Sequence, residues 1–195
     1  MQLQLNSKHK LTWEKVKPLM VQLKKKDYVL HVQLVTRAMQ ALILKEGGNE
    51  DILIPAALLH DIGWSEVSEK LQLASDKEEK LEAERQHLSK ASPIIRTILS
   101  NLNYKKDLIE QIIDVVLSHK FAKPQKKEQQ LLIDADTLSD TYKEAFYSDI
   151  KSYNTTPEEA LAFRGKNTFY TKTARKIFQK ELAARRKEVF LILRT

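Results

Sequence analysis

The sequence of 195 residues contains no cysteine, only 4 glycines and 5 prolines, and few aromatic residues. The absence of cysteine excludes a disulfide framework, thiolate-rich zinc sites and iron–sulfur clusters. The scarcity of glycine and proline favours helices over a β fold rich in turns. We therefore predict an all-α protein that is stabilised without covalent cross-links.

Long apolar runs are also missing. None approaches the roughly 18 residues that a membrane-spanning helix requires. The segment from Met1 to His9 has neither the basic flank nor the apolar stretch of a secretory signal peptide. These absences predict a cytoplasmic protein that does not associate with a membrane.

Positive charge is concentrated in one part of the chain. The net charge is +7, and residues 164–195 alone hold ten Lys or Arg against two acids. Such a segment can bind nucleic acid. Its apolar residues, however, recur with the spacing of an amphipathic helix, which would dock on a domain and leave its basic side chains in water. We favour this structural interpretation over a nucleic-acid partner.

The apolar periodicity predicts seven helices. Gly47 and Gly48 are expected to end the second of them, and Gly63 to follow the third, as helix-stop signals do. The polar stretch from Trp64 to Asp76 should form a loop or a short helix, and the stretch around Asn154 to Pro157 a mobile loop. The expected helices span residues 12–25, 27–46, 50–62, 77–100, 105–119, 126–149 and 168–192.

An adjacent imidazole and carboxylate, His60 and Asp61, end the otherwise apolar run that begins at Ile54. An ionised Asp is almost never buried without a partner, and a divalent cation would satisfy both side chains at once. The alternative is a helix-end cap, in which backbone groups hold Asp61 and a carbonyl holds His60. The dipeptide alone leaves both interpretations open.

Four further residues have the chemistry of metal ligands. His31, His87 and His119 lie in segments with helical periodicity, whereas His9 lies outside the predicted helices. Asp136 is an acid set in the apolar run that starts at Leu131, where burial without a counter-charge would be costly. The chain thus offers ligands in the order His, His-Asp, His, His, Asp.

This order resembles the HD superfamily of metal-dependent phosphohydrolases. The local sequences are similar as well, namely Asp27-Tyr-Val-Leu-His31, Ala57-Leu-Leu-His-Asp-Ile-Gly63 and Asp134-Ala-Asp-Thr-Leu138. The resemblance covers about residues 13–150 and implies a single helical HD domain over residues 1–195, with residues 157–195 as a C-terminal helical extension. The minimal ligand set of the superfamily corresponds here to His31, His60, Asp61 and Asp136.

The resemblance also implies a second metal ion. Superfamily members with two more histidines between the doublet and the last Asp can hold two ions, and His87 and His119 stand at those places. Asp61 would then bridge the ions. Relatives often have Gly-His-Glu at the first of these places, whereas this chain departs from that pattern and reads Gln86-His-Leu-Ser89.

A shell of imidazoles and carboxylates suits Mn, Fe, Co, Ni or Zn. Such an ion lowers the pKa of bound water to about 7 and so provides hydroxide for attack on phosphorus, with Asp61 orienting or deprotonating the water. The implied activity is hydrolysis of a phosphomonoester or phosphoanhydride of a nucleotide or small metabolite. An HD-fold di-iron oxygenase and a nucleotide sensor without turnover remain alternatives, and a homo-oligomer is compatible with the sequence.

An anionic substrate also needs cations near the metal. Arg37 and Lys120 are the nearest in sequence to the ligands, and both are our candidates for substrate contacts, ahead of Lys123, Arg164 and Lys172. Each of these residues could equally be a solvated surface group. Trp64, which follows the doublet, either stacks on a substrate base or fills the core, and we favour the second.

Overall fold

The computed structural model of the protein describes residues 3–192, and these residues form helices without any β-strand. The expected all-α fold is thus confirmed. The last residues of the expected C-terminal extension, 193–195, and the first two of the chain lie outside the described residues. None of the described helices is long and apolar enough to cross a membrane.

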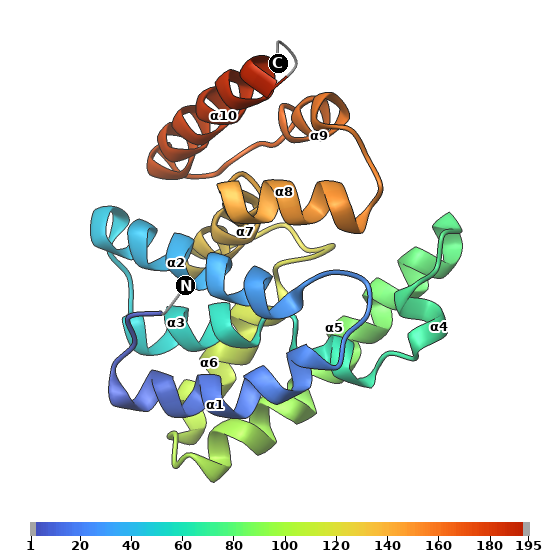
Figure 1. Cartoon of the computed structure of the whole chain (residues 1–195). Coiled ribbons are helices and arrows are strands. Elements are labelled where there is room, and N and C mark those ends of the chain that lie inside the picture. Colours follow the sequence, from blue (N-terminus) through green and yellow to red (C-terminus); the bar gives the residue numbers. More distant parts are fainter. Residues whose placement is uncertain (1–2, 193–195) are drawn as a thin grey trace.

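Helix α3 (Glu50–Leu59) is the centre of the fold (Figure 1). Every residue from Ile52 to Leu59 is buried, so this helix is apolar on all sides and needs neighbours all round. The neighbours that pack on it are α1 (Ser7–Val21), α2 (Tyr28–Glu46), α6 (Lys106–Leu117) and α7 (Lys127–Ser139). The end of α3 therefore lies deep inside the protein.

Two shorter elements and a long helix follow α3. They are the 3-10 helix η1 (Ile62–Glu66), α4 (Glu69–Gln72) and α5 (Lys77–Asn101). Gly63 lies within η1, so the expectation that it ends a helix is wrong. A Cβ atom at this position would stand 1.9 Å from the carbonyl oxygen of His87, so glycine is required because η1 lies directly on the backbone of α5. Gly47, in contrast, ends α2 as expected, with a φ of 72° and its N–H donated to Ile43.

The remaining helices are α8 (Lys143–Ser152), α9 (Pro157–Arg164) and α10 (Lys172–Ile192), which lie at the top of Figure 1. These three helices pack together through a small apolar cluster of Phe146 on α8, Ala160 on α9 and Val189 on α10. Arg164, at the end of α9, is buried and links this helix to α8 and to the end of α7. Its guanidinium donates to the Asp149 carboxylate at 2.6 Å and to the Asp140 carbonyl at 2.7 Å. Arg164 is thus a structural clamp between helices.

Several helix boundaries differ from the expected ones, and three of the differences have a clear local cause. Residues 126–149 form α7 and α8 in place of one helix, because the hydroxyls of Ser139 and Thr141 donate to carbonyls three residues earlier and compete with helical hydrogen bonds. Residues 154–156 lie outside the helices as expected, but α9 was missing from the expected helical spans and is opened by a capping box of Thr156 and Glu159. His9 is helical, because Asn6 caps α1 by accepting a hydrogen bond from the His9 backbone.

Candidate metal centre

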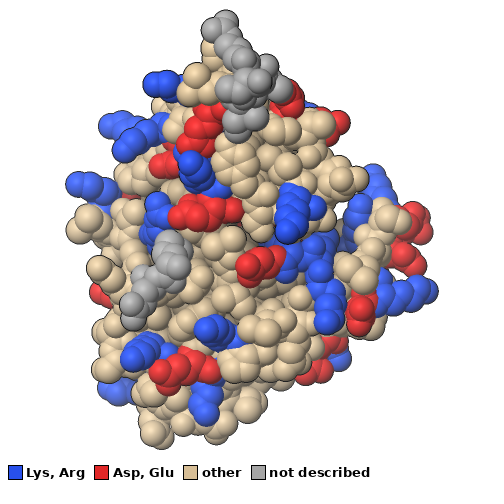
Figure 2. Space-filling view, viewed as in Figure 1, with Lys and Arg blue, Asp and Glu red and all other residues tan. Residues whose placement is uncertain are grey.

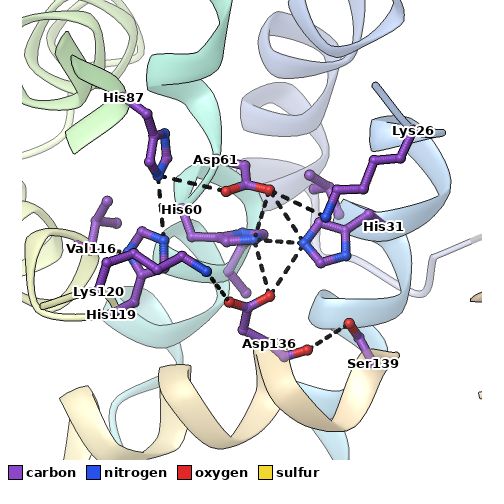
Figure 3. Close-up of polar contacts among 12 residues, drawn as sticks. Lys26, His31, His60, Asp61, His87, Val116, His119, Lys120, Asp136 and Ser139 are labelled. Carbon is purple, nitrogen blue, oxygen red and sulfur yellow. Dashed lines mark hydrogen bonds and ion pairs between the residues drawn. The ribbon is translucent and has the colours of Figure 1, made fainter. Parts of the chain in front are cut away.

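Six side chains from five segments of the chain converge in one buried cluster (Figure 3). His31 comes from the first turn of α2, His60 and Asp61 from the end of α3, His87 from α5, and the last two from the end of α6 and from α7. The structure therefore brings together all six ligand candidates of the sequence. They are His31, His60, Asp61, His87, His119 and Asp136.

The cluster divides into two groups of three potential ligands. His31, His60 and Asp136 form one group, and Asp61, His87 and His119 form the other, with the ligand atoms of each group within 4.8 Å of one another. In the first group, His31 Nε2 lies 3.1 Å from His60 Nε2 and 3.2 Å from Asp136 Oδ1. In the second, His87 Nε2 lies 3.5 Å from His119 Nε2.

The Asp61 carboxylate belongs to both groups. Its Oδ2 lies 3.3 Å from His31 Nε2 and 3.5 Å from His60 Nε2, whereas its Oδ1 faces His87 Nε2 at 3.7 Å. One oxygen is thus turned to each group, which is the arrangement of a carboxylate that can bridge two ions. Asp61 makes no side-chain capping bond to η1, so the alternative of a helix-end cap does not describe its carboxylate.

The ring nitrogens show that the cluster suits a cation. His60 Nδ1 lies 2.8 Å from the Ala57 carbonyl, and His119 Nδ1 contacts the Val116 carbonyl. A carbonyl only accepts, so Nδ1 carries a proton in both rings, and Nε2 is the atom that can offer a lone pair to a metal ion. The Nε2 of His60 faces the carboxylates of Asp61 and Asp136, and the Nε2 of His119 faces the Nε2 of His87, so acceptors face one another. A divalent transition metal would satisfy this concentration of acceptors.

Burial and charge set the protonation of the cluster. Burial lowers the pKa of His87 to about 4 and that of His119 to about 3. Burial would raise the pKa of Asp61, but attraction to His60 and a hydrogen bond from His31 hold it well below its usual value. Burial alone would lower the pKa of His31, as it does for His87 and His119. The hydrogen bonds of His31 to Asp136 and Asp61 instead raise its pKa to about 9.

A cavity of about 270 Å³ opens over the cluster and is lined by His31, Asp61 and Asp136. Two lysines reach into it from opposite sides (Figure 3). Lys120 Nζ lies 3.2 Å from Asp136 Oδ2, and Lys26 Nζ lies 3.9 Å from Asp61 Oδ2. The charge of Asp136 raises the pKa of Lys120, and nearby carboxylates outweigh burial to raise that of Lys26. Both lysines are therefore cationic at neutral pH.

The structure does not bring Arg37 to this cavity. Its guanidinium lies 4.3 Å from the Tyr142 ring centre and 3.3 Å from Glu144. The physical reason is helical rotation, because the six residues from His31 to Arg37 turn the helix by about 600°, which leaves Arg37 about 120° from the His31 face. Lys123 and Lys172 are exposed and do not line the cavity either, and the buried Arg164 serves the helix packing.

Sequence reasoning missed Lys26 and Glu84, which both line the cavity. Lys26 was detectable, since it ends the basic run Lys24-Lys25-Lys26 just before the helix of the first ligand. Glu84 stands one helical turn before His87, and burial raises its pKa. Trp64 is buried and stacks on the His87 ring at a centroid distance of 5.0 Å, so it packs against a ligand candidate and is not a free stacking platform.

Asp134 and Asp136, two residues apart on α7, have different surroundings. Asp134 accepts hydrogen bonds from the backbone amides of Tyr170 and Thr171 and from the Thr171 hydroxyl, at 2.7 to 2.8 Å. It therefore holds the start of α10, while Asp136 faces the metal cluster. Of these two acids, Asp136 is thus the one that lies in the cluster of ligand candidates.

A family model of the HD domain matches residues 28–141. The chain belongs to the HD-domain family. The matched segment contains all six residues of the HD-domain cluster, from His31 to Asp136. No curated protein matches the chain.

One solved structure extends the likeness beyond the matched segment. It is a predicted HD superfamily hydrolase from an uncultured Thermotogales bacterium, with a TM-score of 0.66 and 20% sequence identity. The likeness covers 94% of this chain and 90% of that chain, so the two proteins share the HD fold over nearly their whole lengths.

The division of the ligand candidates into two groups predicts how many ions each variant binds. His87→Ala or His119→Ala should lower the content from about two ions to about one, because each belongs to one group only. Asp61→Ala should remove both ions. Elemental analysis of protein loaded with Mn²⁺ and desalted measures this, with His9→Ala as a control outside the cluster. An unchanged content in both His variants would mean that the cluster is a one-ion site.

The lowered pKa values of His87 and His119 predict that acid destabilises the protein when EDTA removes metals. An unfolded His binds a proton below about pH 6.5, whereas the folded rings resist it until about pH 4 and 3. The free energy of unfolding should therefore fall as the pH drops from 6.5 to 4.5.

His119→Gln should reduce this slope by up to about 1.4 kcal/mol per pH unit, as measured by urea unfolding at several pH values. The pKa of His9 is lowered as well, so some slope remains in the variant. His31→Gln is the control, because its raised pKa affects stability between pH 6.5 and 9. An unchanged acid slope in His119→Gln contradicts the argument.

Proposed function

We propose that this protein is a metal-dependent phosphohydrolase that removes phosphate from a phosphomonoester or phosphoanhydride of a nucleotide or small metabolite. The observation that carries the proposal is the pair of cations, Lys26 and Lys120, on opposite sides of the ligand cluster in one cavity. Two lysines beside a cluster of metal ligands suit a substrate with several anionic oxygens. The name of the structural neighbour, an HD superfamily hydrolase, supports the same reaction class.

The ligand cluster would hold the metal. His31, His60 and Asp136 would bind one ion, His87 and His119 a second, and Asp61 both. A divalent transition metal there supplies Lewis acidity, which lowers the pKa of a coordinated water and polarises a phosphoryl oxygen. The Nδ1 contacts of His60 and His119 with backbone carbonyls fix both rings in the orientation that this binding requires.

The other groups of the cavity bind and orient the reactants. Lys26 and Lys120 would each donate a hydrogen bond to a phosphate oxygen and offset the charge that develops there. The Asp61 carboxylate would accept a hydrogen bond from the attacking water and so direct its lone pair at phosphorus. Because the pKa of Asp61 is held far below neutrality, its role is orientation of the water more than removal of its proton.

Metal replacement tests the proposed function. Protein stripped of metal should recover phosphate release from a panel of nucleotides and sugar phosphates on addition of Mn²⁺ or Co²⁺, because hydrolysis needs only a Lewis acid. Removal of oxygen should not slow the reaction, and His60→Ala is the inactive control. Recovery with iron alone, coupled to oxygen uptake, would instead identify an oxygenase. Tight nucleotide binding without turnover would identify a sensor.

The position of Lys26 predicts a selective effect on substrate binding. Lys26→Ala should raise KM by about 10- to 100-fold, the usual value of a charge-assisted hydrogen bond, with an unchanged metal content. Lys45→Ala is the matched control, because Lys45 is an exposed lysine on α2. Steady-state kinetics and elemental analysis on the same samples measure both effects. A normal KM in Lys26→Ala would remove this lysine from the substrate site.

A further inference from the structure

The cavity over the ligand cluster continues into a larger groove. The groove has a volume of about 1140 Å³ and shares five lining residues with the smaller cavity. These residues are Lys25, Lys26, Asp140, Tyr153 and Phe163. The two spaces are therefore one continuous path from the metal ligands to the surface. A phosphate group fits the inner part, and the outer part is large enough for an organic molecule of considerable size.

The outer groove carries exposed apolar side chains. Tyr153 and Phe163 are 48% and 67% exposed, and Leu73 on the α4 side is 54% exposed. Large apolar side chains gathered in one concave surface usually mark a binding site. The Arg164 clamp fixes the end of α9 next to Phe163, so this ring stands on a rigid support.

The charges of the groove favour an anionic occupant. Two of its acids are engaged, Asp149 with Arg164 and Glu159 with the start of α9. Lys80 and Lys166 line the outer groove and form no ion pair with another described residue. In Figure 2 one group of basic side chains lies on the right, between α8 and the α4–α5 region, with acidic side chains beside it. Positive charge thus extends from the metal ligands along the groove.

We propose that the groove binds the organic part of the substrate, and that this part is bulky and carries an aromatic or similarly apolar group that packs on Tyr153 and Phe163. This inference rests on the proposed phosphohydrolase function, because the phosphate end must lie between Lys26 and Lys120. The continuity of the two spaces sets the direction of the substrate. It also makes small phosphate esters poor substrates, since they leave the aromatic side chains exposed to water.

Two phosphate esters with equally reactive leaving groups test this inference. Ethyl phosphate and 4-phenylbutyl phosphate both release a primary alcohol, so a difference in kcat/KM reports binding of the organic part. The Mn²⁺-loaded protein should prefer 4-phenylbutyl phosphate by about tenfold or more. Phe163→Ala and Tyr153→Ala should each lower that preference several-fold, mainly through KM. Tyr170→Ala is the control, because Tyr170 is equally exposed but lies outside the groove.

A second measurement separates this inference from the proposed function. If neither these esters nor the panel of nucleotides and sugar phosphates is hydrolysed, the phosphohydrolase proposal fails, and calorimetric binding of ethylphosphonate and 4-phenylbutylphosphonate then tests whether the groove binds the organic part. Tighter binding of the phenylbutyl compound, lost in Phe163→Ala, supports the groove. Equal affinities, or an equal kcat/KM for both esters, overturn it. A wild-type dimer that Phe163→Ala converts to a monomer in sedimentation would identify a subunit interface and also overturn it.

Discussion

The structure depends on the compensation of buried negative charge. Asp61 and Asp136 lie inside a helical protein, next to the His60 ring, whose Nδ1 contact with the Ala57 carbonyl turns its Nε2 toward both carboxylates. Such carboxylates stay ionised only when positive charge surrounds them. His31, Lys26 and Lys120 supply that charge within the chain, and a metal ion would supply more. The helices around α3 hold these groups at the required distances.

The same requirement explains why three of the ligand candidates stood out in the sequence, whereas His31, His87 and His119 were assigned through the resemblance to the HD superfamily. An acid or imidazole inside an apolar run is costly, so His60, Asp61 and Asp136 stand out without any structural information. The helical spacing around His87 and His119 indicated that these side chains came from rigid segments. The sequence alone could not choose between a bridging carboxylate and a cap, because that choice depends on where the two oxygens of Asp61 point.

Proximity in sequence was a weaker guide to the residues that surround the ligands. Arg37 follows His31 closely but lies on another face of the same helix, whereas Lys26 precedes the helix and reaches the cluster from a loop. The split between α7 and α8 was missed because apolar periodicity does not detect hydroxyls that compete for backbone carbonyls. For α9, the capping box of Thr156 and Glu159 was a usable signal.

The two carboxylates of α7 have a consequence for the extent of the functional unit. Asp136 lies inside the segment matched by the family model, but the amides that hold Asp134 belong to residues 170 and 171, well beyond it. A fragment cut at the end of that segment would take away the three hydrogen-bond donors of Asp134, on the same helix that carries the ligand candidate Asp136. The contacts that hold the helix of the last ligand candidate thus extend beyond the piece of chain by which the family is recognised.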